Sequence, residues 1–238
     1  MLREVVRTQC STMEPFEGLR LWVVDLDLYA RKETLDGLSE TELARAKKMV
    51  RARDSMRYLV SRHALRRILS TEIGHDQIHI ETDEIGKPRL AADESPQFNL
   101  SHSENFALIG LCKWHAIGVD IEVIRPIGGA DELVRSHFSG SEQLEWSRAP
   151  SQLRDHVFMT YWTRKEACLK ALGVGLVAPL ASIDTSESYK DGIVRIPLGG
   201  GHCDVNVYPV LISEDLIAAV ALAKPIAVSL ARNYFKKC

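Results

Sequence analysis

Gly118-Val-Asp-Ile-Glu122 decides the fold of this chain, because it sets two acids into a stretch that otherwise has the pattern of a buried β-strand. Successive side chains of a strand point to opposite faces, so Asp120 and Glu122 share one face while Val119 and Ile121 share the other. Strands disfavour Asp, and two neighbouring acids on one face repel each other unless something offsets their charge. We therefore interpret the segment as a strand whose acidic face could hold Mg²⁺, with an ordinary solvated strand face as the alternative.

A further acid lies in Trp162-Thr-Arg-Lys-Glu-Ala-Cys-Leu-Lys170, inside a helix that we expect over about 152–172. Gly173 follows as a residue typical of helix ends. Glu166 and Lys170 are four residues apart, so they lie on one helix face, although an ordinary surface Glu–Lys pair would have the same spacing. If this face meets the acidic strand, three carboxylates and an ammonium converge. That set suits Mg²⁺-assisted chemistry on a phosphate group.

The remaining sequence contains an order of helices and strands that occurs twice, which predicts an α+β fold. The expected elements of the first half are helices over about 40–53 and 54–70, strands over 78–82 and 88–90, and a hairpin joining 105–111 to 117–124. Those of the second half are the helix over 152–172, strands over 182–185 and 192–197, and a hairpin joining 202–212 to 216–223.

Two similarities within the sequence suggest that the halves arose by duplication. Tyr58–Leu69 lines up with Tyr161–Leu172, and Ser103–Leu111 lines up with Ser213–Leu222. The two matches occur in the same order along the chain, as a duplicated unit requires. Chance similarity between amphipathic segments is the alternative.

A duplication predicts two similar α+β halves, residues 1–117 and 118–238, related by pseudo-twofold symmetry. Clefts between such units are favoured ligand sites, so we expect the active site between the halves. His63 lines up with Glu166, so only one edge of the cleft would carry the acidic residue. The expected protein therefore has one active site.

The composition excludes several classes of function. The chain has 238 residues, a hydrophobic fraction of 45% and a net charge of −2, which is ordinary for a globular protein and argues against a general nucleic-acid binder. No apolar run approaches the roughly 20 residues of a membrane helix, and the first ten residues lack the apolar core of a signal peptide. Five scattered cysteines match neither a zinc site nor a disulfide framework, so we expect a cytoplasmic protein.

Positive charge is concentrated in one stretch of this nearly neutral chain. Between residues 45 and 67 there are nine cations and one acid, Asp54. The cations are Arg45, Lys47, Lys48, Arg51, Arg53, Arg57, Arg62, Arg66 and Arg67. A solvated basic helix face explains them, and a local anion site is the alternative.

Two other segments carry groups that chemistry could use. The hydroxyls, imidazole and backbone N–H groups of Phe98-Asn-Leu-Ser-His-Ser103 could cradle a phosphate, with simple capping of a turn as the alternative. Glu142 is a candidate general base. Its segment, Ser139-Gly-Ser-Glu142, also has the form of a helix capping box, which would give Glu142 a structural role instead.

Four motifs together resemble those of the 4′-phosphopantetheinyl transferases of the double-length class. They are Gly86-Lys-Pro88, Phe98–Ser103, Gly118–Glu122 and Trp162–Lys170, in the order that the family has. Members of this class modify carrier proteins of polyketide, nonribosomal peptide or fatty-acid synthases. The resemblance implies two similar α+β halves with coenzyme A in the cleft. It implies transfer of phosphopantetheine from coenzyme A to a serine hydroxyl of an apo acyl or peptidyl carrier protein, with release of 3′,5′-ADP.

The resemblance also implies roles for individual residues. Mg²⁺, or Mn²⁺ in its place, would be bound by Asp120, Glu122 and Glu166. Lys170 would contact the pyrophosphate, and Glu166 would act as base directly or through a metal-bound water, with Glu142 as the second candidate. Coenzyme A would be contacted at its nucleotide and 3′-phosphate by Lys87, Arg89, Ser101 and His102, and at its phosphates by Arg45 and Arg57. The protein would be a monomer that binds neither nucleic acid nor a membrane.

Two other classes of protein fit parts of the sequence. A different Mg²⁺-dependent enzyme of phosphoanhydrides, such as a hydrolase, needs the same carboxylates and lysine. A non-catalytic module that binds coenzyme A or a carrier protein needs the fold but not the carboxylates. The presence of Asp120, Glu122 and Glu166 favours an enzyme over a binding module.

Overall fold

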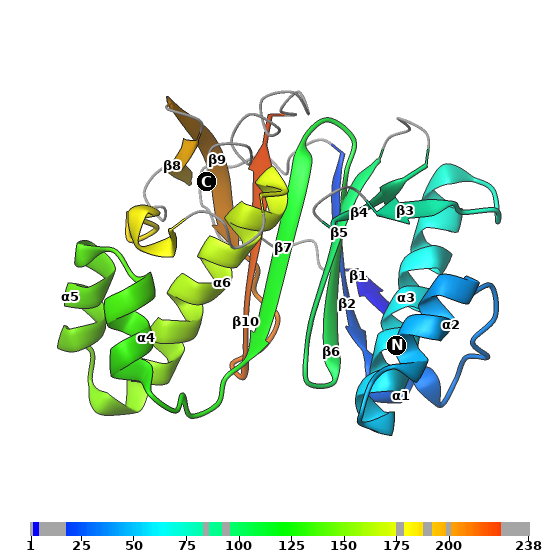
Figure 1. Ribbon diagram of the computed structural model, residues 1–238, viewed down its shortest axis with the longest axis horizontal. Helices are drawn as coiled ribbons and strands as arrows, with labels where there is room; N and C mark the ends of the chain where they lie inside the picture. The colour runs from blue at the N-terminus through cyan, green and yellow to red at the C-terminus, as the bar shows by residue number, and fades with distance from the viewer. Residues whose placement is uncertain are drawn as a thin grey trace.

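Two antiparallel four-stranded sheets, each with a long helix on its outer side, form the core of the protein in the computed structural model (Figure 1). The structure describes residues 2–4, 18–82, 86–91, 96–174, 179–187, 192–198 and 201–224. No helix in these ranges is long and apolar enough to cross a membrane. The combination of helices with antiparallel sheets confirms the expected α+β class.

The first sheet has the strand order β1-β2-β6-β5. Its strands are β1 (Leu2–Glu4), β2 (Leu19–Asp25), β5 (Gln97–Ser103) and β6 (Phe106–Cys112). The helices of this half are α1 (Leu26–Ala30), α2 (Glu40–Lys47) and α3 (Ala52–Ile73), and a separate small ribbon consists of β3 (Ile80–Thr82) and β4 (Pro88–Leu90). Helix α3 ends at Gly74, which adopts the left-handed conformation that glycine tolerates best.

The second sheet has the order β7-β10-β9-β8. Its strands are β7 (Ala116–Val123), β8 (Ile193–Leu198), β9 (Gly201–Pro209) and β10 (Leu216–Ala223). The helices of this half are α4 (Ala130–His137), α5 (Gly140–Arg148) and α6 (Arg154–Leu172), with short 3₁₀ turns over Ser151–Leu153 and Leu180–Ser182. Helix α6 ends at Gly173 with a φ of 66°, as expected from the sequence.

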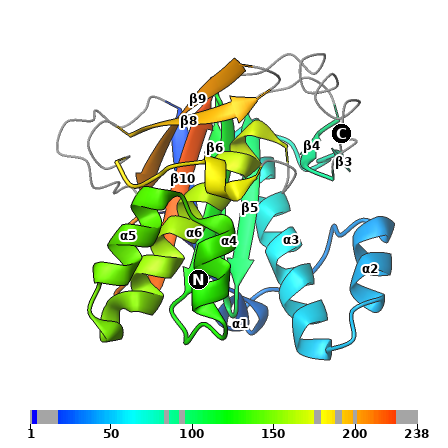
Figure 2. The same ribbon diagram turned by 60° about the vertical axis from the view of Figure 1, so that its left-hand side comes forward.

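The sheets pack face to face, with α3 and α6 on their outer faces (Figures 1 and 2). Alternation along the strands explains how both faces are buried. In β2, Leu21 and Val23 point into the core between the sheets, whereas Trp22 and Val24 point toward α3. In β7 the apolar residues face the other sheet, so the acidic residues of this strand face α6.

The expected hairpin joining 105–111 to 117–124 is wrong. Both strands exist as β6 and β7, but β6 pairs with β2 and β5, and β7 pairs with β10. The actual hairpin joins β5 to β6 through the two-residue turn Glu104-Asn105. The polar side chains of β5 hid this strand from a search for apolar runs, which left β6 without its true partner.

The expected strand over 182–185 is also wrong. The segment forms a 3₁₀ turn and then an extended stretch that pairs with no strand in the described part of the chain. Its backbone groups are bound by side chains instead: Lys165 donates to the carbonyls of Leu180 and Ile183, and Glu142 accepts from the N–H of Thr185. A sheet partner is therefore not needed to satisfy them.

Other expected elements agree with the structure. The helix over 152–172, the strands over 88–90 and 192–197, and the last hairpin are confirmed as α6, β4, β8 and the β9–β10 pair. The two helices expected over 40–53 and 54–70 are α2 and α3, separated over residues 48–51 rather than at 53. Strand β2 and the short helices α1 and α4 had no counterpart among the expected elements.

The two halves share a connectivity within the described ranges. In the first half a strand (β2) is followed by a long helix (α3) and then by a hairpin (β5–β6) whose second strand pairs with β2. In the second half β7, α6, β9 and β10 follow the same order and pairing. The chain passes from one sheet to the other between Cys112 and Ala116. Pseudo-twofold symmetry and the boundary at residue 117 stay predictions.

Candidate active site

A glycine brings the acidic strand and helix α6 together. A Cβ at Gly118 would lie 2.0 Å from the carbonyl oxygen of Ala167 and 2.3 Å from the backbone nitrogen of Ala171. Only a residue without a side chain permits this approach of β7 to α6. The contact places Asp120, two residues along the strand, beside Lys170 of the helix.

Asp120 is buried and is held by groups from two other elements. Its Oδ1 accepts hydrogen bonds from Lys170 Nζ at 2.6 Å and from Ser101 Oγ, on β5, at 2.7 Å. Lys170 Nζ also donates to Ser101 Oγ at 2.9 Å, which closes a triangle of polar groups. Burial raises the pKa of Asp120, and Lys170 and Ser101 only partly oppose this. The second oxygen, Oδ2, is buried without a hydrogen-bond partner.

Glu122 lies two residues further along β7 and is held in a similar way. Its Oε2 accepts a hydrogen bond from Ser103 Oγ at 2.7 Å and another from the guanidinium of Arg125 at 3.1 Å. Ser103 Oγ in turn accepts the backbone N–H of Val123 at 3.2 Å. Strand β5 therefore contributes a serine to each of the two acids of β7.

Three alternate residues of β5 join the two sheets through their side chains. Asn99 Oδ1 accepts the backbone N–H of Val119 at 2.9 Å, and Ser101 and Ser103 bond to the carboxylates as described. Strands β5 and β7 are edge strands of different sheets, and these side chains satisfy groups of β7 that face β5. The segment Phe98–Ser103 was expected to be a turn that cradles a phosphate, and the contacts of Asn99 and Ser103 with β7 were not expected. The polar residues at every second position of Asn-Leu-Ser-His-Ser nevertheless indicate a strand with one polar face.

Glu166 of α6 completes the group of acids. Desolvation raises the pKa of its carboxyl, with Asp120 and Glu122 adding repulsion and Lys170 opposing them. Glu166 is therefore coupled electrostatically to two acids of β7 and to Lys170 of its own helix. None of the described residues donates a hydrogen bond to the Glu166 carboxylate. The structure thus brings together Ser101, Asp120, Glu122, Glu166 and Lys170, as the sequence analysis expected.

The donor set fits a divalent cation such as Mg²⁺, which prefers carboxylate oxygens. The buried Oδ2 of Asp120 has no hydrogen-bond partner among the described residues, and a cation beside it would offset the repulsion that Asp120 and Glu122 exert on Glu166. Within the described ranges no three metal-binding side chains are gathered closely enough to hold an ion as they stand. Lys170, which bonds to Oδ1 of Asp120, supplies the nearest positive charge.

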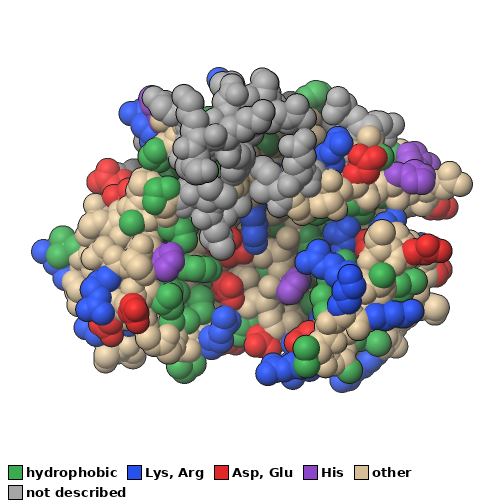
Figure 3. All heavy atoms as spheres, viewed as in Figure 1, with side chains coloured by type: hydrophobic (Ala, Val, Ile, Leu, Met, Phe, Trp, Pro, Cys, Tyr) green, Lys and Arg blue, Asp and Glu red, His purple; other side chains and the backbone are tan. Residues whose placement is uncertain are grey.

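Of the expected contacts to coenzyme A, His102 and Arg45 lie near this group. His102 is exposed at the surface, but the protein around its ring desolvates it in part and lowers its pKa, and the positive charges of Lys170 and Arg45 lower the pKa further. The guanidinium of Arg45 stacks over the ring of Tyr58, 5.4 Å from its centre. Acidic and basic side chains gather near the middle of the face shown in Figure 3, where the two halves meet.

Arg57 binds acidic side chains of the protein, and its expected contact with coenzyme A stays a prediction. Its guanidinium is nearly buried and bonds to both oxygens of Asp27, at 3.0 and 2.9 Å, and to Glu104 at 3.3 Å. Glu104 has a φ of 49°, a left-handed conformation that is strained for a residue other than glycine. Arg57 therefore stabilises the β5–β6 turn, directly after Ser103, by binding its strained residue.

Lys87 and Arg89 bind protein groups as well. Lys87 Nζ donates to the carbonyls of Ile117, Lys170 and Ala171, at 3.1, 2.5 and 3.3 Å, and so caps the C-terminal end of α6. Arg89 forms an exposed ion pair with Glu81 across the β3–β4 ribbon at 3.1 Å. Their expected roles at the nucleotide stay predictions.

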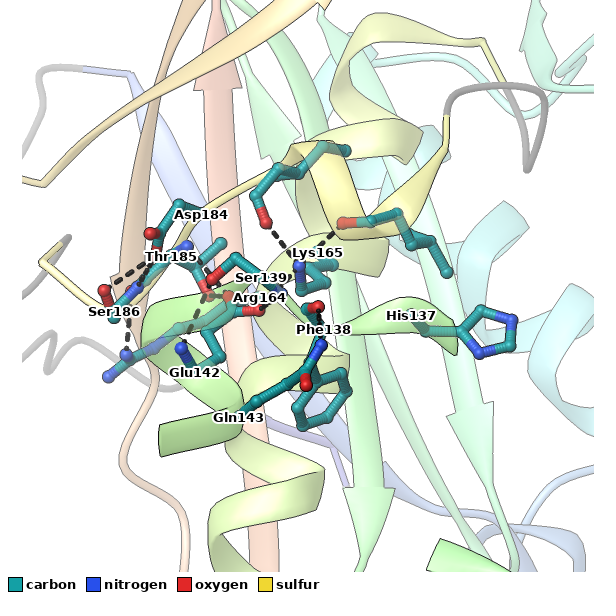
Figure 4. Close-up of polar contacts among 12 residues, drawn as sticks. His137, Phe138, Ser139, Glu142, Gln143, Arg164, Lys165, Asp184, Thr185 and Ser186 are labelled. Atoms are coloured by element: carbon teal, nitrogen blue, oxygen red, sulfur yellow. Dashed lines mark hydrogen bonds and ion pairs between the residues drawn. The ribbon is translucent and has the colours of Figure 1, made fainter. Parts of the chain in front are cut away.

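Glu142 lies in a separate buried cluster, and the capping-box alternative is confirmed (Figure 4). The residue is fully buried and accepts hydrogen bonds from the N–H of Ser139, the N–H and hydroxyl of Thr185, and Lys165 Nζ. A carboxylate enclosed by four donors has no access to a substrate hydroxyl, so the proposal of Glu142 as a base is corrected to a structural role. It connects α5, α6 and the segment over 179–187.

Comparisons with known proteins give one consistent result. The family model for the 4′-phosphopantetheinyl transferase superfamily matches residues 116–221, and a model described as 4′-phosphopantetheinyl transferase, N-terminal, matches residues 30–112. The chain is 34% identical over 175 residues to the 4′-phosphopantetheinyl transferase HetI of Nostoc sp., which covers 71% of this chain and 73% of HetI. It is 28% identical to the 4′-phosphopantetheinyl transferase Sfp of Bacillus subtilis over 73% of this chain and 77% of Sfp. A putative 4′-phosphopantetheinyl transferase of Synechocystis is 34% identical over 63% of each chain.

Proposed function

The chain belongs to the 4′-phosphopantetheinyl transferase superfamily, and we propose that it transfers the 4′-phosphopantetheine arm of coenzyme A to a serine hydroxyl of an apo carrier protein, with 3′,5′-ADP as the other product. The observation that carries the proposal is the meeting of Asp120, Glu122, Glu166 and Lys170 at the contact of β7 with α6. These are the groups that displacement at a pyrophosphate needs: oxygen ligands for a cation, a base and a fixed positive charge.

Asp120, Glu122 and Glu166 are the residues that would hold Mg²⁺. When bound, the cation would supply positive charge that stabilises the pyrophosphate in the transition state. Lys170, beside the Asp120 carboxylate, adds a second positive charge at the site. It would neutralise negative charge that develops on the departing nucleotide phosphate. Ser101 orients the ammonium of Lys170 by accepting one of its hydrogen bonds.

Glu166 is the remaining candidate for the general base after the correction of Glu142. The raised pKa of its carboxyl brings its proton affinity closer to neutral pH, where a base accepts a proton more effectively. It is also the acid without a hydrogen bond from the described residues, so its oxygens are available to the cation and to a substrate hydroxyl. In this role it would accept the proton of the carrier serine during attack on the phosphorus.

Coenzyme A carries several negative charges, and the positive groups near the site favour its binding. Arg45 and His102 lie on the first-half side of the site and are its candidate phosphate contacts. The three free cysteines in the described ranges, Cys112, Cys168 and Cys203, agree with a reducing compartment such as the cytoplasm. The shared connectivity of the two halves supports a monomer in which one chain supplies both sides of the site.

A mass measurement tests the proposal. The protein is incubated with coenzyme A, Mg²⁺ and an apo carrier protein, and the carrier is then weighed by intact mass spectrometry. A gain of one phosphopantetheine arm, absent with the carrier's serine changed to alanine, is the expected result. Release of 3′,5′-ADP without any carrier would instead indicate a hydrolase, and binding of coenzyme A without turnover would indicate a binding module.

A further inference from the structure

Asp120 and Glu122, the two acids of β7, each accept hydrogen bonds through one carboxylate oxygen. In Asp120, Oδ1 accepts hydrogen bonds from Ser101 and Lys170, whereas Oδ2 has no partner in the described part of the chain. In Glu122, Oε2 accepts hydrogen bonds from Ser103 and Arg125, whereas Oε1 receives none from the described residues. Each carboxylate is therefore fixed through one oxygen and keeps the other available for a ligand.

The hydrogen bonds of Ser103 determine the direction of its hydroxyl proton. The backbone N–H of Val123 donates to Ser103 Oγ at 3.2 Å, which occupies a lone pair of the oxygen. The single hydroxyl proton is then donated to Glu122 Oε2 at 2.7 Å, a length typical of a charge-assisted bond. Ser103 is itself buried, at 7% exposure, so water does not compete strongly for either bond.

The two serines of β5 differ in their role. Ser101 contacts Lys170 as well as Asp120 and is thus in direct contact with groups that we assign to the reaction. Among the described residues, the Ser103 hydroxyl hydrogen-bonds to the backbone N–H of Val123 and to the fixed oxygen of Glu122, and to no group that we assign to the reacting phosphate. Its position is secured by the β5–β6 turn, whose strained Glu104 is bound by Arg57.

We propose that Ser103 is a positioning residue that holds the Glu122 carboxylate with Oε1 directed to a divalent cation. This inference rests on the proposed function and extends it to a residue outside the reacting groups. Residues that hydrogen-bond to metal ligands orient them, and their loss weakens metal binding even though they do not touch the ion. Without Ser103, the hydrogen bond that the Glu122 carboxylate keeps from the described residues comes from Arg125, whose side chain is half exposed.

The test measures cation binding directly, with Mn²⁺ as a paramagnetic probe in the presence of saturating coenzyme A. Free Mn²⁺ is titrated by electron paramagnetic resonance for the wild type, Ser103→Ala and Ser103→Thr. We expect Ser103→Ala to weaken Mn²⁺ binding by about tenfold or more. Ser103→Thr keeps the hydroxyl and should restore affinity close to the wild-type value.

Ser61→Ala is the matched control. Ser61 is, like Ser103, a buried serine whose hydroxyl donates a short hydrogen bond, here to the carbonyl of Tyr58 at 2.8 Å, but it lies in α3. Its loss should leave Mn²⁺ affinity unchanged. Should Ser103→Ala not fold, Ser103→Cys takes its place, because a thiol of similar size donates only weakly and the same loss is expected.

A double-mutant cycle isolates the effect through Glu122. In a Glu122→Gln background, Ser103→Ala should cause no further loss of Mn²⁺ affinity, because the group that it positions is already gone. Wild-type affinity in folded Ser103→Ala, or an equal loss in both backgrounds, overturns the inference, as does a wild type that binds no Mn²⁺. Failure of the proposed function has a different signature: Mn²⁺ binds with the expected order of affinities, yet no carrier is modified.

Discussion

At the scale of single residues, the structure separates two kinds of buried charge. Asp120, Glu122 and Glu166 are placed so that they repel one another, and one carboxylate oxygen lacks any partner. Glu142 and Lys165 instead form an ion pair with each other, and each also makes hydrogen bonds to other groups of the protein. Buried acids that repel one another, such as those at the site, are typical of functional sites. Buried acids in complete ion pairs, such as Glu142, more often stabilise the fold.

The first prediction concerns Glu166. Glu166→Gln should reduce kcat/KM at saturating Mg²⁺ by about a hundredfold or more, because it removes both a proposed cation ligand and the candidate base. Thermal stability should stay equal or rise, because the neutral amide relieves the repulsion from Asp120 and Glu122. Carrier modification assays and thermal melts check the two effects together. Wild-type turnover in this variant would remove Glu166 from the site.

The second prediction concerns the Glu142–Lys165 pair. Glu142→Gln should lower the free energy of unfolding by about 3 to 5 kcal/mol, because it leaves the ammonium of Lys165 buried without a counter-charge. The double variant Glu142→Gln with Lys165→Met should lose less than the sum of the single variants. Urea denaturation measures these differences. The fraction that remains folded should retain its specific activity for Glu142→Gln, which a catalytic role for Glu142 would not allow.

At the scale of elements, the contact of β7 with α6 determines where the reacting groups lie. The strand and the helix each place two of these groups on one face by their own periodicity, 2.0 and 3.6 residues. Whether those faces meet depends on Gly118, whose missing side chain leaves room for the backbone of α6. A glycine in a strand usually weakens it, and here it enables close packing instead.

The third prediction follows from this contact. Gly118→Ala should destabilise the protein by about 3 kcal/mol or more and abolish activity, because its Cβ would overlap with rigid backbone atoms at Ala167 and Ala171. Gly140→Ala is the matched control, since no atom lies within 4 Å of a Cβ at the start of α5. It should change stability by less than about 1 kcal/mol. Equal thermal melts for the two variants would contradict this account of the packing.

At the scale of the whole molecule, side chains rather than backbone pairing connect the two sheets at the site. Asn99, Ser101 and Ser103 bridge from β5 to β7. Lys87 reaches from the first half to the end of α6 and to β7, and its methylene stem packs 3.6 Å from the position of a Cβ at Gly173. The apolar core between the sheets holds the two halves together, and these polar contacts fix the site at their junction.

The fourth prediction tests Lys87 as a connector of the halves. Lys87→Met keeps the apolar stem but removes the ammonium that donates to the carbonyls of Ile117, Lys170 and Ala171, although the carbonyl of Lys170 still accepts the N–H of Gly173 at 3.3 Å. The loss of this donor should lower stability by about 1 to 3 kcal/mol. Arg89→Met is the control, because its exposed pair with Glu81 contributes at most about 1 kcal/mol. A raised KM for coenzyme A in Lys87→Met with unchanged stability would instead support the expected nucleotide contact.

The positive stretch over residues 45–67 shows where sequence reasoning was incomplete. Its counter-charges lie elsewhere in the chain: Glu42 binds Arg62 and Arg66, and Asp27 and Glu104 bind Arg57. The sequence of residues 45–67 contains one acid, so this stretch considered alone predicts an exposed basic face. The structure instead places several of these cations in internal ion pairs.

The sequence by itself determined which residues share a face, because the direction of a side chain follows from local backbone geometry. The sequence predicted that Asp120 and Glu122 share a strand face and that Glu166 and Lys170 share a helix face. It also predicted the end of α6 and the capping box at Glu142. Only the tertiary structure decided which faces meet: β6 pairs with β5 rather than β7, Ser103 binds Glu122, and Arg57 binds Asp27. Such contacts join residues far apart in the chain, and they depend on how the whole molecule buries its apolar surface and satisfies its polar groups.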